Sequence, residues 1–72
     1  MPTIANCKIS IYADDHMPPH FRFEGRGFRA VVEIETMMVQ AGDVRRAPEA
    51  LKWACDNIAL LRAEWWRLNQ RA

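Results

Sequence analysis

The stretch that decides the fold is residues 20–35, which read HFRFEGRGFRAVVEIE. In its first part, apolar Phe21 and Phe23 alternate with polar residues. In its last part every second residue is apolar, at Phe28, Ala30, Val32 and Ile34. Because successive side chains of a β-strand point to opposite faces, this period of two predicts strands at about 20–24 and 28–35. The Gly-Arg-Gly between them is a turn signal, so the two strands form a hairpin.

Two shorter segments flank this hairpin. Residues 7–12 (CKISIY) alternate in the same way, and residues 38–41 (MVQA) follow a tight connection. Pro18 and Pro19 separate the first strand from the hairpin, because proline has no N–H to donate to a neighbouring strand. The segments together predict an antiparallel meander of three or four strands.

The remaining sequence predicts one helix at about residues 48–69. Pro48 suits the first helical turn, and Glu49 is favourable near the positive end of the helix dipole. Apolar residues recur at spacings of three and four, at Leu51, Ala54, Cys55, Ile58, Leu61, Trp65 and Leu68. We therefore predict a single α+β domain over residues 1–72, in which a small antiparallel β-meander is followed by one C-terminal helix packed on one face.

The composition limits the classes of function. With 72 residues, 50% of them hydrophobic, the chain can build one small core, and a net charge of +1 argues against a basic nucleic-acid arm. Residues 1–44 hold four Lys/Arg against six Asp/Glu, whereas residues 45–72 hold six against three, which indicates an acidic partner for the second half. We find no signal-peptide pattern and no apolar run of about 20 residues, so we expect a cytoplasmic protein without membrane contact.

Both histidines of the chain lie in one stiff segment, residues 14–23 (DDHMPPHFRF). The prolines between them exclude the helical spacing of zinc-binding histidines, so we predict neither metal nor cofactor. His20 and Arg22 are two residues apart on a strand and should be exposed on the same face, with His16 nearby. An imidazole can move a proton and a guanidinium can bind phosphate, which makes His16, His20 and Arg22 the candidate catalytic residues of a metal-independent, ribonuclease-like activity.

Four other residues are candidates for binding. Trp66 lies off the main apolar stripe of the helix, and an exposed tryptophan there would form a partner-binding patch. Asp14, Asp15 and Arg29 complete the set. The alternative for the loop is structural: the aspartates cap the turn, and the histidines hydrogen-bond to nearby carbonyl groups.

With these residues identified, the chain resembles a widespread family of short bacterial proteins of unknown function. Family members carry the motif Asp-His-x-Pro-Pro-His-Phe-His, and the resemblance covers essentially the whole chain. The matching segments are residues 1–4 (MPTI), 15–21 (DHMPPHF), 28–36 (FRAVVEIET), 42–43 (GD) and 53–66. Arg22 replaces the third histidine of the motif, which favours anion binding over metal binding. Met37 replaces a glycine, which suggests either a positive φ at this position or a different turn.

The resemblance also implies a function. The family is similar in size and gene neighbourhood to type II toxin–antitoxin components. It thus implies a small protein partner, such as a cognate antitoxin, and RNA or the translation machinery as a target. The alternative is a non-catalytic binding module or inhibitor, of phage origin and directed against host defence, that recognises a host protein complex.

Overall fold

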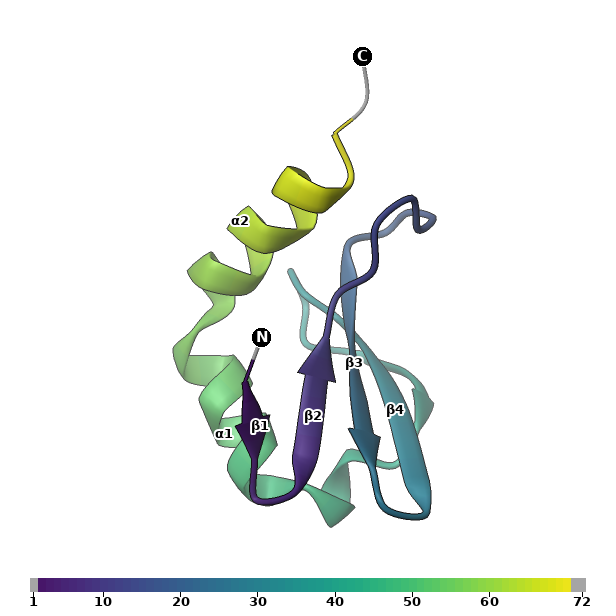
Figure 1. Cartoon of the computed structure of the whole chain (residues 1–72), viewed down its shortest axis with the longest axis vertical. Coiled ribbons are helices and arrows are strands. Elements are labelled where there is room, and N and C mark those ends of the chain that lie inside the picture. The colour runs from purple at the N-terminus through teal and green to yellow at the C-terminus, as the bar shows by residue number, and fades with distance from the viewer. Residues whose placement is uncertain (1, 71–72) are drawn as a thin grey trace.

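A computed structural model describes residues 2–70 and shows an antiparallel five-stranded sheet with two helices on one side (Figure 1). Each strand pairs with the one before it, so the order in the sheet is the order in the chain. The elements are β1 (Thr3–Ile4), β2 (Cys7–Ser10), β3 (His20–Gly25), β4 (Phe28–Glu33), β5 (Val39–Gly42), the 3₁₀ turn η1 (Val44–Arg46), α1 (Pro48–Asp56) and α2 (Ile58–Leu68).

The β3–β4 hairpin lies at the centre of the core. Its register runs from His20 opposite Glu33 to Gly25 opposite Phe28, around a two-residue turn. The side chains on its inner face, which α1 and α2 cover, are the buried ones: Phe21, Phe23, Ala30 and Val32. Ile34, Leu61 and Trp65 are fully buried as expected, whereas Phe28 and Ile58 are only partly buried at the margin of the core.

The predicted meander of three to four strands is wrong, because the sheet has a fifth strand at its N-terminal edge. β1 pairs with β2 through a two-residue turn, Ala5-Asn6, whose φ angles are 48° and 66°. Positive φ at both positions is what a type I′ hairpin turn requires. A strand of two residues is too short for alternation to reveal it.

The predicted single helix over 48–69 is also wrong, because the helix is interrupted at Asn57. The φ and ψ of Asn57 are −130° and 32°, and its backbone N–H donates to the carbonyl of Ala54, three residues back, at 3.1 Å. The carbonyl of Trp53 accepts instead from the Asn57 side chain at 2.8 Å. An asparagine side chain that hydrogen-bonds to the backbone competes with the helix in this way. Within residues 2–70 neither helix has the length and apolar character needed to cross a bilayer.

Gly42 provides a test of the sheet geometry. It has a φ of 82°, and a Cβ added there would lie 2.0 Å from the backbone oxygen of Arg29 on β4. We expect Gly42→Ala to lower the free energy of unfolding by at least about 2 kcal/mol, because strain from the positive φ adds to a backbone clash. Urea denaturation followed by circular dichroism measures this loss.

The matched control is Gly27→Ala. Gly27 has a similar φ of 76°, but a Cβ there would meet nothing within 4 Å. We expect it to cost only about 1 kcal/mol. Equal losses in the two variants would contradict the close approach of β5 to β4.

Candidate functional site

Residues 11–19 connect β2 to β3 and are held in place by the end of α2. The side-chain oxygen of Asn69 accepts from the backbone N–H of Asp15 at 2.8 Å. Its amide nitrogen donates to the carbonyls of Tyr12 at 3.0 Å and Trp65 at 3.1 Å. Asn69 is only 3% exposed, so these hydrogen bonds form in a buried setting where each one is costly to lose.

The carboxylate of Asp15 is the centre of this loop. Oδ1 accepts from the backbone N–H of His16 at 2.9 Å and lies 3.1 Å from Nδ1 of the same histidine. Oδ2 lies 2.9 Å from Nε2 of His20 and accepts from Nη2 of Arg22 at 3.1 Å. Burial alone would raise the pKa of Asp15, but the hydrogen bonds from Arg22 and His16 and the charge of His20 together lower it. Asp15 is therefore ionised at neutral pH.

His20 is 5% exposed, so the expectation of an exposed imidazole pair is wrong. Its Nδ1 is 2.8 Å from the carbonyl oxygen of Pro18, and its Nε2 faces Asp15. The centre of its ring lies 5.0 Å from that of Trp65 and 5.4 Å from that of His16. Both ring nitrogens of His20 therefore lie beside an oxygen atom. His20 thus serves as a link between the loop, the sheet and α2.

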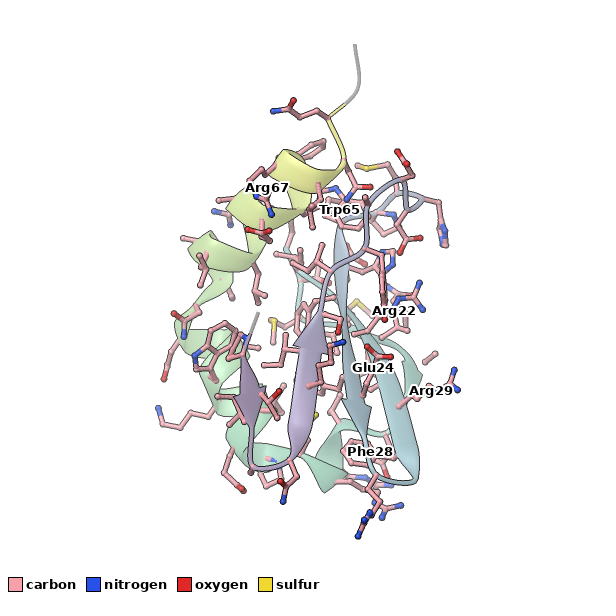
Figure 2. The ribbon with its side chains drawn as sticks, viewed as in Figure 1. Arg22, Glu24, Phe28, Arg29, Trp65 and Arg67 are labelled. Atoms are coloured by element: carbon pink, nitrogen blue, oxygen red, sulfur yellow. The ribbon has the colours of Figure 1, made fainter. Side chains whose placement is uncertain are left out.

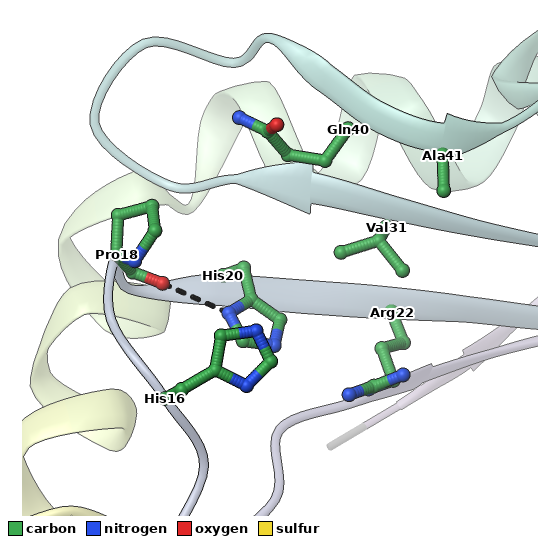
Figure 3. A pocket seen from close by; sticks show the side chains of 7 residues that line it. All are labelled: His16, Pro18, His20, Arg22, Val31, Gln40 and Ala41. Atoms are coloured by element: carbon green, nitrogen blue, oxygen red, sulfur yellow. Dashed lines mark hydrogen bonds between the residues drawn. The ribbon is translucent and has the colours of Figure 1, made fainter.

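A pocket of about 230 Å³ opens beside this cluster, on the outer face of the sheet (Figure 3). Its lining residues are His16, Pro18, His20, Arg22, Val31, Gln40 and Ala41. The His16 side chain is 83% exposed and the Arg22 side chain 35%, so both donors can be reached from solvent. Nε of Arg22 is itself buried and has no hydrogen-bond partner within residues 2–70. Val31 on β4 and Ala41 on β5 give the pocket an apolar floor, and His16 and Arg22 add hydrogen-bond donors beside it. Such a lining suits a ligand in which an anionic group is attached to a flat apolar group.

The other candidate residues are spread over the surface. Asp14 is exposed with a φ of 57°, and it makes no hydrogen bond or ion pair with any residue of the described part of the chain. Arg29 is exposed on β4 and lines a neighbouring hollow. Trp66 is 45% exposed on α2 and does not line the pocket. Among the described residues, no three His, Cys, Asp or Glu side chains gather so that they could hold a metal ion.

Several residues of the site were absent from the sequence-based set. One feature of the sequence could have identified Asn69: it lies at the end of the predicted helix, and asparagine is favoured just after a helix. Tyr12 was assigned only to a strand, yet its ring lies under the Arg22 guanidinium at 5.3 Å. Gln40 and Ala41 enter the pocket through the pairing of β5 with β4, which alternation alone does not place.

These features define a small α+β protein with a donor-lined pocket on the open face of its sheet. The chain belongs to the family described as a domain of unknown function, DUF4160, whose model matches residues 7–66. The match runs from the start of β2 into α2 and includes the whole segment from Asp14 to Phe23. No curated protein and no solved structure matches the chain significantly.

The Asp15 cluster yields a pH-dependent prediction. We expect Asp15→Asn to lower the free energy of unfolding by about 1–3 kcal/mol at pH 7, since it removes charge-assisted hydrogen bonds to His20 and Arg22. The pKa of Asp15 is lowered in the folded protein, so its stabilisation is present above the unfolded value of about 3.9 and is lost as the pH falls through the folded value. Denaturant titrations from pH 7 to pH 3 measure the difference, which should shrink below about pH 4.

Asp14→Asn is the matched control, because it removes the same charge from an exposed neighbour. Asparagine tolerates a positive φ, so we expect a change within about 0.5 kcal/mol. A constant difference between wild type and Asp15→Asn across this pH range would contradict the role of the carboxylate.

Proposed function

We propose that this chain is a small cytoplasmic protein of toxin–antitoxin type that acts by binding RNA, and that the pocket beside Asp15 contacts a phosphate group. The observation that carries the proposal is the meeting of Arg22 and His16, both accessible to solvent, at one pocket. Guanidinium and imidazole groups are common phosphate donors. A small protein partner would hold the chain in its complex, as the family resemblance implies.

The geometry favours binding over the two-histidine version of catalysis. A metal-independent ribonuclease needs one group to remove a proton and a second to donate one, both within hydrogen-bond reach of the substrate. His20 is buried, and each of its ring nitrogens already faces an acceptor, Pro18 or Asp15. His16 alone remains accessible, with its Nδ1 beside the Asp15 carboxylate, which orients the ring.

A second candidate function rests on the exposed surface of α2. Trp66 is 45% exposed and Leu60 is 48% exposed, both on α2. Tryptophan is enriched among the residues that carry most of the binding energy at protein interfaces. This supports the alternative of a non-catalytic module or inhibitor that recognises a host protein complex.

Variants of the two accessible donors test the RNA proposal. We expect His16→Ala and Arg22→Gln each to weaken binding of a labelled nine-nucleotide RNA roughly tenfold, or about 1.4 kcal/mol, because each removes one phosphate contact. Fluorescence anisotropy at two salt concentrations measures the dissociation constant, which should rise with salt. Glutamine is used because Arg22→Glu would place a second carboxylate beside Asp15, which lies 3.1 Å from the guanidinium.

Lys52→Gln is the control, since Lys52 pairs with Asp56 on α1 and is remote from the pocket. It should leave the affinity unchanged within about twofold. Folding of every variant is checked by its thermal melt. Wild-type affinity in both folded pocket variants would refute RNA binding at this pocket and turn attention to the surface around Trp66.

A further inference from the structure

The outer face of the sheet carries a row of three adjoining hollows. The pocket described above shares Arg22 and Val31 with a second hollow of about 150 Å³. This second hollow shares Glu24 and Arg29 with a third, at the β3–β4 turn. Figure 2 shows Arg22, Glu24 and Arg29 following one another along these strands, away from Arg67 on α2. We call this row the outer track.

The dimensions of the outer track suit one extended chain. From His20 to Gly25 the strand makes five steps of about 3.3 Å, which gives a length of roughly 17 Å. The track follows two neighbouring strands, whose spacing is about 4.8 Å. A single extended strand can lie along such a surface with its bases against the protein. A duplex, whose bases are stacked inside, would present mainly its phosphates.

The middle of the track holds a stacked pair of planar groups. The Arg22 guanidinium lies 5.3 Å from the centre of the Tyr12 ring, which is 44% exposed. The Tyr12 hydroxyl donates to Glu24 at 2.8 Å, and Ser10 donates to the same oxygen at 2.7 Å. These two hydrogen bonds lower the pKa of Glu24 and fix the tyrosine ring. Nucleobases stack on aromatic rings and on guanidinium planes, so this pair can receive a base.

Arg29 supplies a second cation along the track. Its side chain is exposed and makes no hydrogen bond or ion pair within residues 2–70. Its cross-strand neighbour is Glu24, whose Oε1 accepts from Ser10 and Tyr12. Four other arginines of the described chain have carboxylate partners: Arg22 with Asp15, Arg45 with Asp43, Arg62 with Glu35 and Arg67 with Glu64. Arg26 and Arg46 resemble Arg29 in having no such partner among the described residues. The charge of Arg29 helps to lower the pKa of Glu24, but the two side chains form no hydrogen bond, so the guanidinium of Arg29 is available to an external anion.

We propose that the outer track binds single-stranded RNA in an extended conformation. One phosphate lies at His16 and Arg22, a later phosphate lies at Arg29, and bases between them pack on Val31 and the Tyr12–Arg22 pair. The inference rests on the proposed function and deepens it, because it names the form of the RNA and a second contact point outside the first pocket.

Arg29→Gln tests the second contact point. We expect it to weaken binding of a nine-nucleotide RNA roughly tenfold and to change binding of a mononucleotide less than twofold, because only a strand of several nucleotides reaches from His16 and Arg22 to Arg29. The slope of log K against log salt should fall by about 0.7 for the longer RNA. A duplex of the same sequence should bind more weakly than the single strand.

Arg67→Gln is the matched control. Arg67 lies on α2, away from the outer track (Figure 2), and lines none of its three hollows. Its loss changes the net charge by the same amount, so any non-specific electrostatic effect is equal in the two variants. We expect the affinity for the nine-nucleotide RNA to stay within twofold of wild type.

The possible results separate the two proposals. If Arg29→Gln and Arg67→Gln weaken binding equally, if the duplex binds as tightly as the single strand, or if polyglutamate of the same total charge displaces the RNA, the outer track is overturned. In the first two cases RNA binding at His16 and Arg22 stands, provided that their variants still lose affinity. If wild type binds none of these RNAs, the proposed function itself is overturned, together with the track.

Discussion

The structure depends on covering one apolar face of a small sheet. Phe21, Phe23 and Val32 have no exposed surface, and each such side chain contributes about 1.5–3 kcal/mol when removed from water. β-sheets twist, so a long straight helix diverges from the strands beneath it. The interruption at Asn57 divides the covering into two shorter helices, each of which buries two residues: Ala50 and Ala54 on α1, Leu61 and Trp65 on α2.

The polar cluster is a consequence of this packing. The last turn of α2 brings Trp65 against His20 and places Asn69 beside the backbone of Asp15. A buried carboxylate is tolerated when it is hydrogen-bonded and paired, and here His20 and Arg22 provide both. In this cluster His20 has a structural role, Arg22 is partly accessible and His16 lies at the surface. The packing of the fold therefore determines which of these side chains can contact a ligand.

The sequence predicted the elements in which the apolar pattern extends over many residues. Alternation located the β3–β4 hairpin, and the three- and four-residue spacing of the helix predicted the burial of Trp65. The family resemblance left two possibilities at Met37, a positive φ or a different turn, and the φ is 60°. The sequence did not reveal the helix break, although Asp56 and Asn57 are weak helix formers, because the apolar stripe continues across them. The sequence placed His20 on the correct strand but predicted that its side chain is exposed. The side chain is buried because Trp65, which is distant in sequence, packs against it.

The three side-chain hydrogen bonds of Asn69 also concern the order in which the molecule forms. Two of them close contacts over 54 and 57 positions, to Asp15 and Tyr12, whereas the β3–β4 hairpin joins near neighbours. Local contacts close with a smaller entropy loss than distant ones, so the hairpin can form early in synthesis. The loop that carries Asp15 and His16 gains its anchor only after Asn69 has been synthesised. A nascent chain can therefore form this hairpin before its site, and the anchored loop marks a chain that has been synthesised as far as Asn69.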